Sequence, residues 1–233
     1  MIFITGDVHR RFGRIEHFCK ENKTTSKDVM IVLGDASLNY YLNEKDLRLK
    51  ERVKEIPLTF FFIHGNHEER PYMVAGYEEK EWKNGIVYAD PRYPNQLFAK
   101  DGEIYNLARR QTIVIGGAYS VGKPIRLERG MPWFPSEQPS DEIKKRVLEK
   151  LDESRWRVDD VLTHTCPYEH IPRHLFLGNV EQASVDHSTE HWLQQIENRI
   201  SYDRWFYGHY HGNCQDGKLR CLYKGIEVFA GEN

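Results

Sequence analysis

Aspartates, histidines and one asparagine stand in five short motifs, each directly after an apolar run. In chain order these are Asp7-x-His9, Gly34-Asp35, Gly65-Asn66-His67-Glu68, Thr163-His164 and Gly208-His209-x-His211. They offer seven oxygen or nitrogen ligands and one further histidine, and no cysteine. Carboxylate, amide and imidazole groups suit divalent Mn, Fe or Zn, whereas a thiolate-rich set would indicate structural zinc. Together the five motifs indicate a two-metal hydrolase, in which paired cations clamp a phosphoryl group and activate a water molecule.

The segments before these motifs have the pattern of β-strands. Strands rich in Val, Ile or Phe are predicted at 1–5, 29–33, 58–63, 112–115, 160–163 and 205–207. Apolar residues at helical spacing predict helices at about 11–21, 43–55, 142–153 and 188–200, and short strands are expected within 205–229. The βαβαβ order of the first half predicts a parallel sheet, which gathers its ligands at the carboxyl ends of the strands.

The length and composition of the chain limit its number of domains and the classes of protein that it fits. The 233 residues, without repeats or a low-complexity linker, fit one domain spanning 1–233. A formal net charge of −2 gives no bulk attraction for nucleic acid, which stays a possible partner only through a local basic patch. The longest apolar run, 58–63, is far short of the roughly 20 residues that span a membrane, and no signal peptide precedes the first strand. Because the four cysteines also lack C-x-x-C spacing, we expect a cytoplasmic protein with reduced thiols and no membrane partner.

The five motifs, in this order, resemble those of the calcineurin-like metallophosphoesterase superfamily, D-x-H, G-D, G-N-H-[DE], H and G-H-x-H, and extend from Asp7 to His211. The resemblance implies an α/β fold, a four-layer αββα sandwich of two mixed sheets with a dinuclear metal site at the carboxyl ends of the strands. It also implies two divalent metal ions, Mn, Fe or Zn. Its ligand sets are Asp7, His9 and His211 for one ion and Asn66, His164 and His209 for the other, with Asp35 bridging both.

His67 has a different role in this pattern. The resemblance implies that it faces the scissile phosphate as a general acid or transition-state stabiliser, a role that suits imidazole near neutral pH. Glu68, the next residue, either orients His67 or completes the turn. His67 and Asp35 are therefore the predicted catalytic residues.

Departures from the family pattern bear on the substrate. Arg10 stands where many relatives have glycine and could hold a phosphate oxygen, or could be an exposed charge at a helix entry. The residues at 34–40 read G-D-A-S-L-N-Y, without the arginine of the phosphoprotein phosphatase and diadenosine-tetraphosphate hydrolase branches. The segment 116–123 is similar to one in small bacterial and phage metallophosphoesterases of unassigned substrate, although those often have an acid at the position of Gly122. There Lys123, Arg126 and Trp133 could form a cationic, aromatic lid, or Trp133 could simply pack in a loop.

Three functional classes follow. The favoured one is a phosphomonoesterase that hydrolyses phosphate esters with a metal-activated water, its substrate a phosphorylated small molecule, a nucleotide or a phosphoprotein bound by Arg10, Lys123 and Arg126. The second is a phosphodiesterase or nuclease acting on nucleotides or nucleic acid. The third, a metal-bound scaffold without catalysis, is disfavoured by the presence of His67 and the full ligand set.

Overall fold

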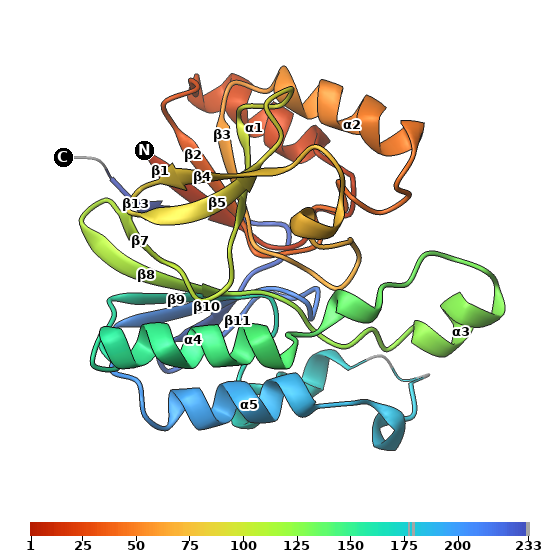
Figure 1. The fold of residues 1–233 in the computed structure, drawn as a ribbon, viewed down its shortest axis with the longest axis vertical. Coiled ribbons are helices and arrows are strands. Elements are labelled where there is room, and N and C mark those ends of the chain that lie inside the picture. The colour runs from red at the N-terminus through yellow and green to blue at the C-terminus, as the bar shows by residue number, and fades with distance from the viewer. Residues whose placement is uncertain (177, 179, 232–233) are drawn as a thin grey trace.

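Two mixed β-sheets packed face to face, each covered by helices on its outer side, make up the fold in the computed structural model (Figure 1). The structure describes residues 1–176, 178 and 180–231. The helices are α1 (Gly13–Asn22), α2 (Glu44–Lys54), α3 (Lys123–Glu128), α4 (Asp141–Glu153) and α5 (Ser188–Glu197). This arrangement confirms the predicted αββα sandwich.

The first sheet has the order β13-β1-β2-β3-β6-β5-β4. Its strands are β1 (Ile2–Thr5), β2 (Val29–Val32), β3 (Thr59–Phe62), β4 (Glu78–Trp82), β5 (Gly85–Ala89), β6 (Gln96–Ala99) and β13 (Ile226–Ala230). Strands β1, β2, β3 and β6 are parallel, and β13, β5 and β4 extend the sheet with antiparallel pairs. The predicted parallel unit is therefore the centre of this sheet.

The second sheet has the order β11-β12-β10-β9-β8-β7. Its strands are β7 (Ile104–Leu107), β8 (Arg110–Ile115), β9 (Asp160–Thr163), β10 (Arg204–Tyr207), β11 (Cys214–Asp216) and β12 (Leu219–Cys221). Strands β8, β9, β10 and β12 are parallel, with antiparallel β7 and β11 at the edges. Both sheets thus have a parallel centre.

Alternating side chains of the strands fill separate layers of the core. Along β3, Phe61 lies in the cluster between the two sheets, whereas Phe60 and Phe62 pack with Phe12 beneath α1 and α2. A third cluster, which includes Trp205, joins the second sheet to α4 and α5. Successive side chains on a strand point to opposite faces, so strands buried on both faces read as nearly continuous apolar runs.

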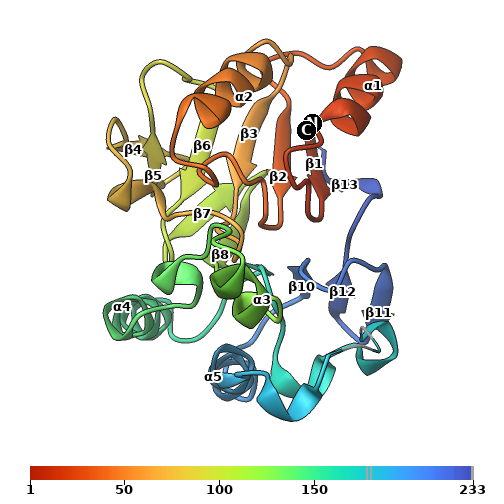
Figure 2. The same ribbon diagram turned by 90° about the vertical axis from the view of Figure 1, so that its right-hand side faces the viewer.

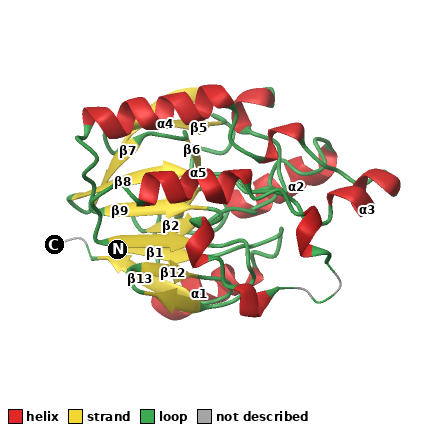
Figure 3. Cartoon of the chain, turned by 90° about the horizontal axis from the view of Figure 1, so that it is seen from below, coloured by secondary structure: helices red, strands yellow, loops and turns green. Residues whose placement is uncertain are grey.

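The quarter-turn view in Figure 2 shows α1 and α2 against the first sheet and α4 and α5 against the second. Helix α3 projects beyond these layers at one end of the molecule, as Figures 1 and 3 both show. The described part of the chain contains no helix with the length and apolar character that a bilayer crossing requires.

The predicted strands and helices are all present, with boundaries that differ by up to three residues. No local sequence pattern predicts an element between 64 and 111, where β4, β5, β6 and β7 lie, or a helix at α3. Strand β4 reads EEKEW and is mostly exposed at the edge of its sheet, so it lacks the apolar alternation by which a strand is recognised. Helix α3 has six residues and buries none of them, so it lacks an apolar stripe.

Candidate metal centre

The five sequence motifs follow five strands, from both sheets, and lie close together where the two sheets meet. Each motif follows the carboxyl end of a parallel strand: β1, β2 and β3 in the first sheet, and β9 and β10 in the second. Loops of one or a few residues then bring the side chains together where the two sheets meet. Ligands collect at such strand ends because the parallel strands all stop at the same edge.

The first group of donor atoms comes from Asp7, His9 and His211. The Nε2 atoms of His9 and His211 lie 2.8 Å apart, and His211 Nε2 lies 3.1 Å from Asp7 Oδ2. Asp7 is buried, and its Oδ2 has no hydrogen-bond partner among the residues that the structure describes. A buried carboxylate oxygen without a donor is costly unless a cation balances it, so these residues fit a metal ion.

The second group consists of Asn66, His164 and His209. Asn66 Oδ1 lies 2.8 Å from His164 Nε2 and 3.1 Å from His209 Nδ1. His164 donates Nδ1–H to the Leu33 carbonyl at 2.7 Å, which leaves the lone pair of its neutral ring on Nε2. Asn66 donates Nδ2–H to Ser120 Oγ at 2.8 Å, so its carbonyl oxygen points to the histidines. Electron-pair donors that converge in this way fit a second cation.

Asp35 lies between the two groups. Its Oδ2 is 3.7 Å from His9 Nε2 and its Oδ1 is 3.7 Å from His164 Nε2, while Oδ1 also accepts the His67 backbone N–H at 2.8 Å. Burial by itself would raise the pKa of this carboxyl, but His67, His164 and His9 outweigh that effect and lower the pKa. The resemblance gives Asp35 the bridging role, and its position between the groups is compatible with that prediction.

Two motif glycines allow the donors to approach each other. A Cβ at Gly34, whose φ is +97°, would lie 2.0 Å from His164 Nδ1, and a Cβ at Gly208 would lie 2.4 Å from Asp7 Oδ1. Any other residue at either position would displace a metal-donor side chain. The glycines of the motifs are therefore needed for close packing between the strand ends.

Left-handed backbone conformations are concentrated at the same strand ends. Positive φ values occur at His9 (46°), Asp35 (50°), His209 (67°) and His211 (53°), none of which is glycine. Such conformations cost about 1–3 kcal/mol each and persist only where the surroundings enforce them. The surrounding fold thus holds these four residues in strained conformations that aim their side chains at the centre.

His67 lies beside the donor groups, with its Nε2 4.0 Å from Asp35 Oδ2. Burial, with further contributions from Arg126 and His9, lowers its pKa to about 4 despite the opposing effect of Asp35. The ring is therefore neutral at neutral pH before substrate binds, and can donate one N–H. Glu68 instead accepts the backbone N–H groups of Ala36 and Leu38 at 3.2 and 3.3 Å. Glu68 thus holds the loop after β2.

A family model described as calcineurin-like phosphoesterase matches residues 1–213. The chain belongs to this family. Membership makes this phosphoesterase a metal-dependent phosphoester hydrolase, and among the described residues Asp7, His9 and His211, and likewise Asp7, Asp35 and His164, have donor atoms close enough to hold a metal ion. No curated protein matches the sequence.

Solved structures are similar to the phosphoesterase at low sequence identity. The protein TT1561 of Thermus thermophilus is 14% identical, with a TM-score of 0.52, over 95% of this chain and 87% of that chain. The phosphopantetheinyl hydrolase of Mycobacterium tuberculosis is 12% identical, with a TM-score of 0.41, over 95% of this chain and 87% of that one. At these values only the first likeness supports the fold, and neither bears on the substrate.

Of the predicted substrate-binding residues of the phosphoesterase, Arg126 lies beside His67. Its Nη2 is 3.4 Å from His67 Nε2, and its Nη1 donates to Tyr40 Oη at 2.8 Å. Arg10 instead pairs with Asp46 at 2.5 Å and donates to the Ser37 carbonyl at 2.7 Å. The guanidinium of Arg10 thus already has strong partners, whereas Arg126 faces the centre.

Lys123, on the projecting α3, lies 4.3 Å above the Trp133 ring, so the cation and the aromatic side chain of the predicted lid are in contact. Two hollows in the protein surface lie beside the metal centre. Arg126 lines both of them, whereas Lys123 lines neither. The residues of the predicted lid thus come together, but only Arg126 extends to the site.

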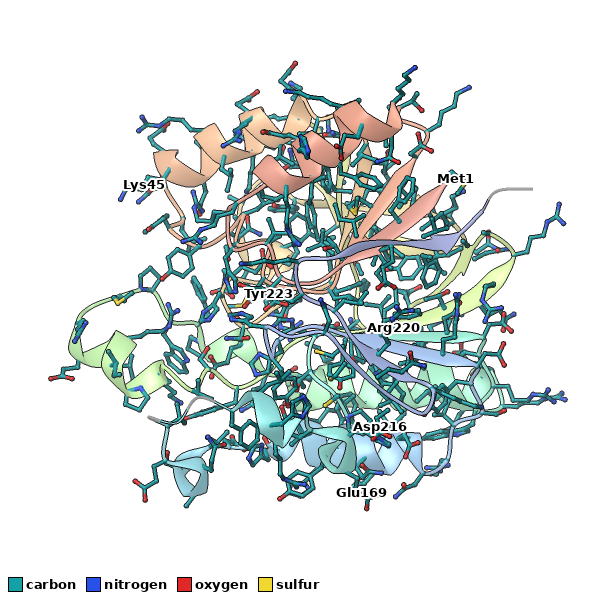
Figure 4. All side chains as sticks on the ribbon, turned by 180° about the vertical axis from the view of Figure 1, so that it is seen from behind. Met1, Lys45, Glu169, Asp216, Arg220 and Tyr223 are labelled. Carbon is teal, nitrogen blue, oxygen red and sulfur yellow. The ribbon has the colours of Figure 1, made fainter. Side chains whose placement is uncertain are left out.

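The two hollows lie on either side of His67 and Arg126. The larger, of about 710 Å³, is lined by Arg10, Arg11, Arg14, Lys224 and Tyr223 together with Asp7, His9 and His211. Tyr223 stacks on His211, with ring centroids 4.7 Å apart, and Figure 4 shows it between the two sheets. The smaller hollow, of about 410 Å³, adds an apolar wall of Leu175, Phe176, Val180 and Val185 to polar residues of the centre. The phosphoesterase therefore offers two chemically different spaces beside one centre.

Sequence reasoning missed residues that act from outside the motifs. Ser120, which orients Asn66, lies in the segment 116–123 that the resemblance singled out, but no role was predicted for it, and Glu190, which lines the smaller hollow, lies in a helix without a motif. A serine in a loop and a glutamate in an amphipathic helix are ordinary in sequence. Ser120 is identified only by its hydrogen bond with Asn66, which lies 54 positions away in the sequence.

Proposed function

We propose that this phosphoesterase is a phosphomonoesterase that hydrolyses a phosphorylated small molecule, nucleotide or phosphoprotein. When bound, two divalent cations would polarise the phosphoryl group and supply an activated water. Mn, Fe and Zn all suit the mixed oxygen and nitrogen donors. Side chains of the protein perform the remaining steps.

Three side chains have roles in this proposal. Asp35 holds its carboxylate between the two donor groups and receives the His67 backbone N–H, which fixes the two residues relative to each other. His67 faces the leaving oxygen as a general acid or transition-state stabiliser, and its pKa of about 4 favours the neutral ring, which stabilises that oxygen by donating a hydrogen bond. Arg126 binds a terminal phosphate oxygen next to His67.

The position of Arg126 is the observation that carries the proposal. A monoester has more charge on its terminal oxygens than a diester, so a guanidinium beside the general acid favours the monoester. A second candidate, a phosphodiesterase acting on nucleotides or nucleic acid, is favoured by the two hollows, because a diester has an organic group on each side of phosphorus.

The test compares hydrolysis of an aryl phosphomonoester and the matching bis-aryl phosphodiester by protein reconstituted with Mn²⁺. We expect the monoester to be preferred, and His67→Ala to lower its kcat about 10²- to 10⁴-fold, which is the usual contribution of a general acid. Preference for the diester would replace this proposal with the second candidate. Hydrolysis of neither ester by metal-loaded protein would support a non-catalytic scaffold.

The role of Arg126 has its own test. Arg126→Gln should lower kcat/KM for the monoester about 10- to 100-fold and for the diester less, because a charged hydrogen bond contributes about 1.5–3 kcal/mol. The matched control is Arg129→Gln, an exposed arginine at the end of α3 that lines neither hollow. Equal losses on both esters would contradict the proposed selectivity.

Three further parts of the proposal stay predictions. Arg10 and Lys123 bind substrate only if they leave their present partners, Asp46 and Trp133. Residues 1–233 act as one domain. A cytoplasmic location with reduced thiols stays a prediction as well.

A further inference from the structure

The smaller hollow combines an apolar wall with two carboxylates, Asp35 at the metal centre and Glu190 outside the predicted donor set. Leu175, Phe176 and Val185 line it together with Tyr119, and the donor residue His209 lies at its border with the metal centre. A space of about 410 Å³ is large enough for an aromatic ring with a short substituent. The organic part of an ester held at the metal centre can therefore occupy it.

Glu190, the third residue of α5, is the carboxylate of this hollow that does not belong to the predicted donor set, and it is only 3% exposed. Its Oε1 accepts the Thr165 hydroxyl at 2.7 Å, and Thr165 Oγ1 lies 3.0 Å from Tyr210 Oη. Thr165 is itself fully buried in the loop after β9. The carboxylate is thus fixed in orientation before any ligand arrives.

The second oxygen of Glu190 lacks a partner. Oε2 is buried and has no hydrogen bond within the described ranges, and the nearest basic atom, His187 Nδ1, is 3.7 Å away. That distance exceeds a hydrogen bond. Nothing in the described part of the fold satisfies this oxygen, although an unpaired buried acceptor is costly. A ligand with an N–H or O–H group would supply the missing donor.

We propose that this hollow binds the organic group of the substrate and that Glu190 selects, through Oε2, an apolar or aromatic group carrying an N–H or O–H donor. An amine would pair with the carboxylate most strongly, a hydroxyl less so, and a hydrocarbon chain of the same length not at all. The inference rests on the proposed phosphoester hydrolysis and adds the class of substrate to it.

Three aryl phosphates of matched shape test the selection: 4-(2-aminoethyl)phenyl, 4-(2-hydroxyethyl)phenyl and 4-propylphenyl phosphate. For the Mn²⁺-loaded protein we expect kcat/KM to be at least about 10-fold higher for the amine than for the propyl compound, with the hydroxyl compound between them. The ratio within one protein is the readout, so a general change in activity does not affect it.

The variant Glu190→Gln keeps the side-chain shape and an acceptor for Thr165, but it removes the charge. It should reduce the amine-to-propyl ratio to about 2 or less. Glu169→Gln is the matched control: Glu169 is exposed, packs in the turn beside α5, lines neither hollow, and lies at the outer edge in Figure 4. It should keep the full ratio. If Glu190→Gln does not fold, Thr165→Val, which frees the carboxylate to rotate, should lower the ratio as well.

Two results would overturn the proposal. One is a wild-type ratio within about twofold of unity, and the other is an equal loss on all three esters in Glu190→Gln, which would mean that Glu190 only supports the fold.

If none of the esters is hydrolysed, the proposed function fails first, and calorimetry then tests the hollow alone. Tyramine should bind at least about 10-fold more tightly than 4-propylphenol, and Glu190→Gln should remove the difference. Equal affinities, or no binding, would refute the site.

Discussion

At the scale of single residues, the predicted metal donors depend on partners that orient them. Asn66 presents its carbonyl oxygen to His164 and His209 because its amide nitrogen is engaged by Ser120. Both Asn66 and Ser120 are buried, so no water replaces this hydrogen bond freely. The orientation of one amide therefore determines whether the second donor group is complete.

Replacing Ser120 by alanine should weaken metal binding by the second donor group, which consists of Asn66, His164 and His209. We expect the affinity for the second metal ion to fall about 10-fold, since loss of an outer partner usually costs 10- to 100-fold. The free energy of unfolding of the metal-free protein should fall by only about 1 kcal/mol. Titration calorimetry with Mn²⁺ gives both stoichiometry and affinity, and Ser184→Ala, at an exposed serine that bonds only the Glu181 carbonyl, is the control. Unchanged affinity of both ions would show that Asn66 is held by other contacts.

At the scale of the elements, the site depends on how closely the ends of β1 and β10 approach. Gly208, directly after β10, faces Asp7 Oδ1 and the Leu33 carbonyl, which a Cβ would meet at 2.4 and 2.8 Å. The Asp7 and Leu33 segments belong to the first sheet and Gly208 to the second. This contact thus sets the spacing of the two sheets at the metal centre.

Gly208→Ala should therefore force the strand ends apart. We expect it to lower the free energy of unfolding by about 1–3 kcal/mol, as overpacking does, and to abolish binding of at least one ion. Gly13→Ala, at the first residue of α1 with nothing within 4 Å of the new Cβ, should leave stability unchanged or slightly higher. Urea unfolding with and without metal checks both variants. An unaffected Gly208→Ala protein would mean that the sheets can separate at little cost.

At the scale of the whole molecule, buried histidines make the fold sensitive to acid. His64 is 3% exposed, and within the described residues neither ring nitrogen has a hydrogen-bond partner. Burial, together with the positive charge of Arg70 and with His164, places its pKa well below the ordinary value. Burial also lowers the pKa values of His67 and His209 to about 4.

Stability of the metal-free protein should consequently fall as the pH drops from about 6.5 toward 4. In that window the unfolded chain, with histidine pKa values near 6.5, binds protons that the folded state does not, so acid favours unfolding. Each such histidine contributes up to about 1.4 kcal/mol per pH unit. His64→Phe should show a slope smaller by up to that amount in urea unfolding at pH 7, 6 and 5. Identical slopes for both proteins would indicate that His64 is already protonated in the fold.

The sequence by itself determined the chemistry and most of the elements. Each motif is a few residues long and directly follows its strand, and the apolar patterns of strands and helices are local, so both could be read without the fold. The pairing of donors into two groups came from a resemblance. The edge strand β4 and helix α3 escaped prediction because exposed elements have no apolar pattern to mark them.

Tertiary structure alone decided which residues surround the motifs. Ser120 reaches Asn66 across 54 residues, Arg126 reaches His67 across 59, and Thr165 fixes Glu190 across 25. Such contacts depend on how β8, α3 and α5 are placed against the strand ends, which no local pattern specifies. The same packing engages Arg10 with Asp46. Local residue types thus indicate the reaction class, whereas the shape and charge that select a substrate arise where distant segments meet.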